Sequence, residues 1–179
     1  DGEAESGPLC AAWHSNKFMN PKISGAVLPI LHVNGFKISN PTIYGSMDNR
    51  EIRKLFEGYG YEVLIVEGAN LETKMIKAMD LAYKKICKRP LKRPMIVLRS
   101  QKGWKGVHDF GGHKIEGSFR SHGTPLEDAK KNPEALDAVY KWLKSYKINK
   151  LLKDGKFRNE LFKFVPAGKC RIGMNKHAI

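Results

Sequence analysis

The chain has 179 residues, of which 41% are hydrophobic, which suits one buried core and argues against a disordered polypeptide. Its 32 Lys and Arg residues outnumber its 18 Asp and Glu residues, so the formal net charge is +14. No apolar run approaches the roughly 20 residues of a membrane span, no signal-peptide pattern is present, and the three cysteines are too widely spaced for a zinc site. We therefore expect reduced thiols, a cytoplasmic location and no membrane partner.

The positive charge by itself is typical of a nucleic-acid-binding protein. The lysines, however, are spread over several predicted helices and do not cluster with exposed aromatic residues in one basic block. A lysine-rich solvated surface accounts for this distribution, and a basic cleft would also attract small phosphates. We predict no nucleic-acid partner, and an RNA-binding module stays an alternative that a salt titration of binding decides.

The first elements are a helix or helical turn over residues 6–18 and a strand over residues 26–33. The second segment is a continuous apolar run with β-branched residues, which predicts a strand buried on both faces. Pro29 argues against a central place in a sheet, so the sequence favours an edge position or a bulge there.

Asp48 and Glu51 have the spacing of a capping box and predict a helix that ends at Gly58. A second buried strand follows over residues 61–67. Asn70 is expected to cap the next helix, whose core face is predicted from apolar residues at helical spacing: Leu71, Met75, Met79, Ala82 and Ile86.

Prolines at positions 90 and 94 bracket a linker before a third strand over residues 95–99. The alternation of strand and helix predicts an α/β fold, a parallel sheet with flanking helices. Ligands of such sheets bind at the carboxyl ends of the strands. This rule places Asn34, Gly68 and the residues after Arg99 along one rim, where we expect the chemistry.

The segment Ser100–Asp128 is too long and too rich in glycine to be a plain connection, which is typical of a functional loop. It contains His108, His113 and His122, but their spacing does not match a zinc site. His108 and His113 are therefore interpreted as loop histidines.

Asn132 and Pro133 predict the N-cap and first position of a further helix. Residues 151–164 are a second amphipathic stretch that is interrupted by Gly155, and the last residues have no convincing periodicity. We expect one domain over residues 1–166 and a linker toward a further domain over residues 167–179.

Asp1 is followed by a glycine, and Asn34 stands at the end of the first predicted strand. Carboxylate and amide oxygens are ligands that Mg²⁺ prefers, and Mg²⁺ readily shares such ligands with phosphates. The two residues alone leave two interpretations open, a magnesium diphosphate site or a plain turn followed by a strand.

The residues between Asp1 and Asn34 favour the magnesium diphosphate site. The runs DGEAESGPLCAAWHSNKFMNP and GAVLPILHVNGFKISNPT closely resemble the cofactor-binding segment of phosphoketolases, which belong to the thiamine diphosphate enzyme family. The family motif is Gly-Asp-Gly followed by a distant Asn, and the chain matches it from Asp1 onward. We therefore expect a fragment of the diphosphate-binding N-terminal domain, in which Asp1 carries a free amino group.

The resemblance implies that the side chains of Asp1 and Asn34 and the main-chain oxygen of Phe36 bind Mg²⁺. It also implies that Gly2 and Glu3 lie against the diphosphate of thiamine diphosphate.

The runs RPMIVLRSQKGWKG and SFRSHGTPLED look like two further segments of the family, and the second is similar to an element of transketolases. The resemblance implies that Lys102 and His122 are active-site residues that also contact the cofactor. An ammonium group and an imidazole N–H are suited to neutralise diphosphate oxygens, hold a sugar hydroxyl and stabilise developing oxyanion charge.

The reaction implied by the resemblance is a lyase step of carbohydrate metabolism. Xylulose 5-phosphate or fructose 6-phosphate is cleaved with inorganic phosphate to acetyl phosphate and an aldose phosphate, with loss of water. The family further implies a homodimer in which another domain binds the pyrimidine end of the cofactor, so we expect this chain alone to be inactive. A transketolase-like enzyme and a non-catalytic relative stay open as alternatives.

Overall fold

The computed structural model describes residues 1–20, 22–88, 91–123 and 126–174. The chain forms two compact units, Asp1–Glu127 and Asp128–Ile179. The linker expected over residues 167–179 stays a prediction, and its last five residues lie outside the described part. Within the described part, no helix is both long and apolar enough to cross a membrane.

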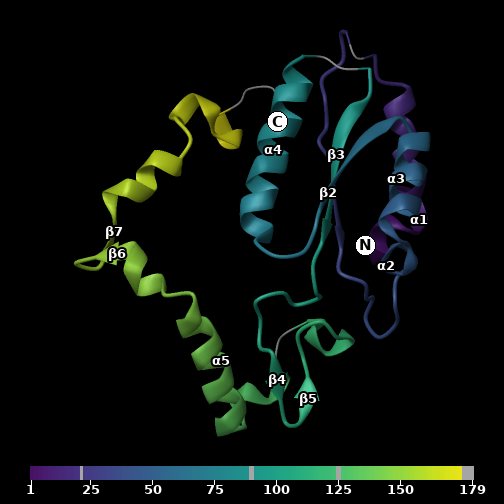
Figure 1. Cartoon of the computed structure of the whole chain (residues 1–179). Helices are drawn as coiled ribbons and strands as arrows, with labels where there is room; N and C mark the ends of the chain where they lie inside the picture. Colours follow the sequence, from purple (N-terminus) through teal and green to yellow (C-terminus); the bar gives the residue numbers. More distant parts are fainter. Residues whose placement is uncertain (21, 89–90, 124–125, 175–179) are drawn as a thin grey trace. The chain divides into compact units, whose positions relative to one another are not determined.

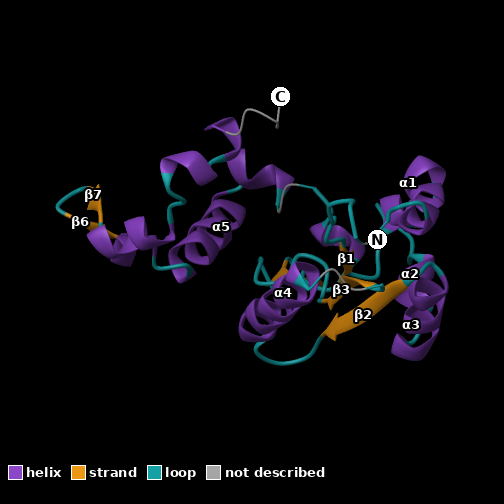
Figure 2. Ribbon diagram, turned by 90° about the horizontal axis from the view of Figure 1, so that it is seen from above, coloured by secondary structure: helices purple, strands orange, loops and turns teal. Residues whose placement is uncertain are grey.

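A three-stranded parallel sheet is the centre of the first unit (Figure 1). Its strands are β1 (Ile30–Val33), β2 (Tyr61–Val66) and β3 (Arg93–Arg99), and the order is β1-β3-β2. Helices lie on both sides of the sheet (Figure 2). The predicted α/β class with a parallel sheet and flanking helices is confirmed.

The middle strand β3 holds the register of the sheet. Ile96 pairs with Ile30 of β1 on one side and with Leu64 of β2 on the other. The first five residues of β3 are buried, because a helical layer covers each face. Pro94 lies inside β3 and not in a linker, so that part of the prediction was wrong, whereas Pro90 lies outside the described residues.

One face of the sheet packs against an aromatic cluster. The Phe56 ring contacts those of Trp13 and Tyr44 edge to face, with centroids 5.0 and 5.7 Å away. Such contacts add to the hydrophobic gain of burying large rings. The elements on this side are α1 (Gly7–Ala12), a 3₁₀ helix (Trp13–Lys17), α2 (Ile43–Ser46) and α3 (Asn49–Gly58).

The predicted capping box at the start of α3 is confirmed. The Glu51 N–H donates to Asp48 Oδ1 at 2.8 Å, and the Asp48 N–H donates to Glu51 Oε2 at 2.8 Å. These two bonds satisfy amide groups that have no partner within the helix.

Helix α4 (Leu71–Cys87) covers the other face and buries Leu71 and Ala82 as predicted. Met75 is partly buried against this cluster, but Met79 is 46% exposed, so its assignment to the core was wrong. Asn70 stands at the N-cap position with φ 58° and makes no capping bond with its side chain, which corrects its expected role.

Strand β1 is shorter and less buried than predicted. It has four residues, of which Leu31 and Val33 are buried while Ile30 and His32 are exposed. The reason is its place at one end of the described sheet, where α4 packs mainly on the other two strands. The edge position favoured by Pro29 is confirmed.

After β3, the long loop contains a small hairpin of β4 (Asp109–Phe110) and β5 (His113–Lys114). In the second unit, α5 (Pro133–Ser145) begins as predicted, with Asn132 Oδ1 accepting from the Glu134 and Ala135 N–H groups. Residues 151–164 do not form one element. They contain a hairpin of β6 (Leu152–Lys153) and β7 (Lys156–Phe157), followed by a 3₁₀ helix (Asn159–Phe164).

The capping box predicts a pH dependence of stability. The Glu51 N–H bond is the largest cause that lowers the pKa of Asp48 below its ordinary value of 3.8. A group whose pKa is depressed by folding stabilises the protein above its unfolded pKa, and this contribution is lost as the pH falls through the folded pKa. The variant Asp48→Asn keeps a capping oxygen without the titration. Urea unfolding at several pH values should show a stability difference from wild type that is constant near neutrality and shrinks below about pH 4; a difference that does not change with pH contradicts the account.

Candidate functional site

The carboxyl ends of the three strands meet at one edge of the sheet, as predicted. A cavity of about 720 Å³ at this edge is lined by residues that include Asn34, Gly68 and Arg99. The rim expected from the order of strands and helices is therefore present.

A second cavity, of about 400 Å³, gathers the predicted site residues. The residues that line it come from the chain start, from the loop after β1 and from the loop after β3. They include all seven residues that the sequence assigned to metal or cofactor: Asp1, Gly2, Glu3, Asn34, Phe36, Lys102 and His122. Their assembly in one cavity is an observation, and their roles stay predictions.

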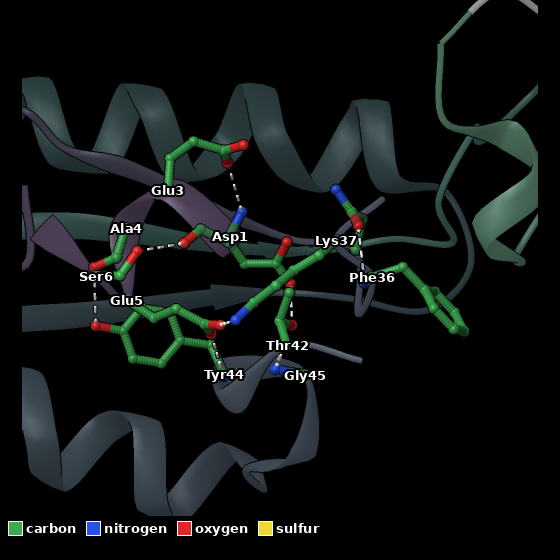
Figure 3. A network of polar contacts seen from close by, with 12 residues as sticks. Asp1, Glu3, Ala4, Glu5, Ser6, Phe36, Lys37, Thr42, Tyr44 and Gly45 are labelled. Atoms are coloured by element: carbon green, nitrogen blue, oxygen red, sulfur yellow. Dashed lines mark hydrogen bonds and ion pairs between the residues drawn. The ribbon is translucent and has the colours of Figure 1, made fainter. Parts of the chain in front are cut away.

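The Asp1 carboxylate joins the chain start to the loop after β1 (Figure 3). Its Oδ2 atom accepts from the Gly35 N–H at 2.9 Å and from the Thr42 hydroxyl at 2.7 Å. The side chain is only 1% exposed, and Oδ1 is buried without a hydrogen-bond partner in the part of the chain that the structure describes. A buried carboxylate oxygen without a partner is unfavourable, so this atom is suited to bind a cation or a donor.

The two other predicted metal ligands are half-buried and already make contacts. Asn34 Oδ1 accepts from the Phe36 N–H at 3.1 Å, and the Phe36 carbonyl accepts from Lys102 Nζ at 2.9 Å. A metal bound by both residues would have to share or replace these bonds.

Lys102 lies deeper in the cavity than a lysine at a strand end normally would. Its side chain is held by two main-chain oxygens, those of Phe36 at 2.9 Å and Lys37 at 3.1 Å, and the residue is 8% exposed. Burial lowers the pKa of Lys102, while the nearby Glu3 carboxylate opposes the shift. The loop after β3 thus places a desolvated cation beside the predicted metal ligands.

The other predicted residues are more open. The side chain of Glu3 is 90% exposed, and His122 is exposed just after a 3₁₀ helix (Phe119–Ser121). Gly2 is constrained by space, because a Cβ atom there would lie 3.1 Å from Lys37 Cγ. A side chain at this position would fit only if the Lys37 stem moved by a few tenths of an ångström.

The residues of this cavity fit a hard cation with oxygen ligands. A carboxylate, an amide and a carbonyl oxygen are the donor types that Mg²⁺ takes, and Asp1 Oδ1 has no hydrogen-bond partner among the described residues. No group of three or more His, Cys, Asp or Glu side chains among the described residues could hold a metal. The fit therefore depends on the mixed oxygen set.

Sequence reasoning missed three residues that shape the cavity. Thr42 is fully buried, donates to Asp1 and accepts from the Gly45 N–H at 3.0 Å as the cap of α2. Its place before a short helix is a capping signal that could have been noticed. Glu5 and Lys37 form a 2.6 Å ion pair, and no local pattern predicts a pair 32 positions apart.

The larger cavity contains a second polar pair. The buried carboxylate of Glu116 accepts from His108 and, at 2.8 Å, from the Lys105 N–H. The interpretation of His108 as a loop histidine is refined by this contact, since its ring is held by a buried carboxylate.

Comparison with known proteins agrees with the geometry. The family model described as XFP N-terminal domain matches residues 1–179. A protein named "Probable phosphoketolase" from Rhodopirellula baltica is 46% identical over 194 residues, which cover 99% of this chain and 24% of that protein. A "Probable phosphoketolase" from Bradyrhizobium diazoefficiens is 46% identical over 195 residues, again covering 99% of this chain and 24% of that protein. A "Probable phosphoketolase 1" from a Nostoc strain is 45% identical over 191 residues, covering 98% of this chain and 24% of that protein.

The α/β sheet, the cavity at its carboxyl edge and the full-length match to this model define an XFP N-terminal domain. The chain belongs to the phosphoketolase family. It spans about a quarter of the length of the curated relatives that it matches.

The close approach of Gly45 to Gly35 predicts a strong effect of one methyl group. A Cβ atom at Gly45 would lie 2.7 Å from Gly35 Cα and 2.7 Å from Thr42 Oγ1. We expect Gly45→Ala to lower the free energy of unfolding by about 1–3 kcal/mol, because main chain must move. The control Gly58→Ala lies in open space at the end of α3 and should be neutral or stabilising by up to about 1 kcal/mol. Equal effects of the two substitutions in denaturant unfolding contradict the close contact.

Proposed function

We propose that this chain is the part of a phosphoketolase that binds Mg²⁺ and the diphosphate of thiamine diphosphate. The whole protein then cleaves xylulose 5-phosphate, fructose 6-phosphate or both with inorganic phosphate, giving acetyl phosphate, an aldose phosphate and water. The observation that carries the proposal is the buried Asp1 carboxylate, which has a free oxygen in the same cavity as Lys102.

In this proposal, Asp1 Oδ1, the Asn34 amide oxygen and the Phe36 carbonyl hold Mg²⁺. Gly2 and Glu3 lie against the diphosphate, where the missing side chain of Gly2 lets an anion approach the main chain. When bound, thiamine diphosphate supplies the electron sink for carbon–carbon cleavage, and the protein supplies position and charge.

Lys102 and His122 supply charge and hydrogen bonds at the same cavity. The ammonium of Lys102 is desolvated, and charges act more strongly where water is excluded. His122 is exposed at the cavity and can donate an imidazole N–H to a sugar hydroxyl or a phosphate. Together they would orient the sugar phosphate and stabilise developing negative charge.

The remaining features of the proposed enzyme concern parts beyond this chain. The relatives are about four times longer, which supports a role for further domains in binding the pyrimidine end of the cofactor. We propose a cytoplasmic aldehyde-lyase that acts as a homodimer, with sugar phosphate and inorganic phosphate as its substrates.

The active-site roles are tested in the full-length protein. Lys102→Met and His122→Asn should each lower acetyl phosphate formation by at least about 100-fold, since each removes a donor from the reacting centre. The matched controls are Lys84→Met and His113→Asn, two exposed residues that line neither cavity, and they should stay near wild-type activity.

Three results would overturn the proposal in different ways. Unchanged rates in both active-site variants would remove Lys102 and His122 from the mechanism. Ketol transfer without phosphate-dependent acetyl phosphate would indicate a transketolase-like enzyme. Tight RNA binding that weakens steeply with salt, without enzymatic activity, would favour the nucleic-acid alternative suggested by the +14 charge.

The isolated chain should form no acetyl phosphate, because the proposal assigns half of the cofactor site to other domains. The measurement is a coupled assay of the purified chain with thiamine diphosphate, Mg²⁺, sugar phosphate and phosphate, beside the full-length protein as positive control. Turnover by the chain alone would show that this assignment is wrong.

A further inference from the structure

Lys37 contacts every segment of the cavity, although the proposed function assigns it no role. We propose that Lys37 is a positioning residue, which holds the Asp1–Glu3 turn in place through its ion pair with Glu5. The inference rests on the proposed function, because the position that it fixes is that of the metal and diphosphate ligands.

The ion pair joins a buried carboxylate, that of Glu5, to the ammonium of Lys37, whose side chain is 44% exposed (Figure 3). Lys37 Nζ lies 2.6 Å from Glu5 Oε1, and the Glu5 side chain is 2% exposed. The other carboxylate oxygen of Glu5 accepts from the Tyr44 N–H at 3.2 Å. Burial would raise the pKa of Glu5, but the Lys37 ammonium and backbone N–H groups outweigh it and keep the pKa below its ordinary value.

The aliphatic stem of Lys37 fixes the main chain of the turn. Its Cγ atom lies 3.1 Å from the point that a Cβ atom of Gly2 would occupy. The stem therefore lies against Gly2 and closes one side of the turn, while Asp1 Oδ2 is held from the other side by Gly35 and Thr42.

The main chain of Lys37 also supports the two loops. Its N–H donates to the Asn40 carbonyl at 2.7 Å, which closes the turn after β1. Its carbonyl accepts from Lys102 Nζ at 3.1 Å. One residue thus connects the chain start, the loop with Asn34 and Phe36, and the loop after β3.

The charges around Lys37 indicate a positioning role and not direct binding of an anion. The Lys37 ammonium is neutralised by a buried carboxylate, whereas the hydrogen bonds of Lys102 within the described part of the chain go to two neutral carbonyls. Removing the Lys37 charge leaves Glu5 buried and uncompensated, which is strongly unfavourable. The turn must then move to expose Glu5 to water, and Asp1 moves with it.

The test measures binding of Mn²⁺ and thiamine diphosphate to the full-length protein, by Mn²⁺ electron paramagnetic resonance and protein fluorescence, together with kcat at saturating cofactor. Lys37→Met and Glu5→Gln should each weaken binding about 10–100-fold, the usual effect of losing a partner of a ligand. The value of kcat at saturation should fall less than about threefold, because the bound geometry is restored by the ligands themselves.

Two further variants make the result specific. Lys37→Met combined with Glu5→Gln should bind better than Lys37→Met alone, since no buried charge is left unpaired. Lys85→Met breaks the ion pair of Lys85 with Glu62, 2.7 Å long and distant in sequence from the cavity, and should leave binding unchanged.

The possible outcomes test the positioning role of Lys37 separately from the proposed function. A wild-type protein that binds neither ligand overturns the proposed function and this inference together. Wild-type binding with unchanged affinity in Glu5→Gln overturns the inference alone, and this variant decides even if Lys37→Met fails to fold. A loss of kcat with unchanged affinity would make Lys37 a participant in the reaction and contradict the positioning role.

Discussion

The geometry of the cavity depends on one carboxylate. Asp1 Oδ2 bonds the Gly35 N–H and the Thr42 hydroxyl, so the start of the chain is fixed to the loop that follows β1. Within this loop, the backbone at Gly45 can lie close to Gly35 because Gly45 has no Cβ atom. Because Oδ2 makes these structural bonds, Oδ1 is left buried with no hydrogen-bond partner among residues 1–20, 22–88, 91–123 and 126–174. Asp1 Oδ2 therefore stabilises the fold, while Oδ1 is available for a ligand. For this reason the contact between Asp1 and the loop is a candidate metal site.

Much of the fold and of the position of the site could be predicted, because residues close together in the sequence determine these features. The capping box at Asp48 and the apolar runs of β2 and β3 predict their elements from local periodicity alone. The order of the elements then predicts the rim, since the carboxyl ends of parallel strands lie together. The seven site residues came from the family resemblance and not from periodicity, and the fold brings all seven to one cavity.

The parts that failed depend on contacts between distant segments. Periodicity places Met79 near the core face of α4, but its side chain is 46% exposed, because the packing of α4 on the sheet and not the period decides which residues are covered. The second amphipathic stretch is a different case, because the local turn at Asp154 and Gly155, with φ values of 51° and 74°, forms a hairpin at the interruption expected at Gly155. The Glu5–Lys37 pair joins residues 32 positions apart, and no local rule identifies which lysine will neutralise a buried carboxylate.

The central claim is that Asp1, Asn34 and the Phe36 carbonyl form one metal site with the diphosphate. Anomalous diffraction from crystals of the full-length protein with Mn²⁺ and thiamine diphosphate tests it most directly. The account predicts one peak at bonding distance, about 2.0–2.2 Å, from Asp1 Oδ1, the Asn34 amide oxygen and the Phe36 carbonyl, with the diphosphate on the same ion. A peak bound by other residues, with Lys102 still donating to the Phe36 carbonyl and Asp1 Oδ1 unliganded, would contradict it.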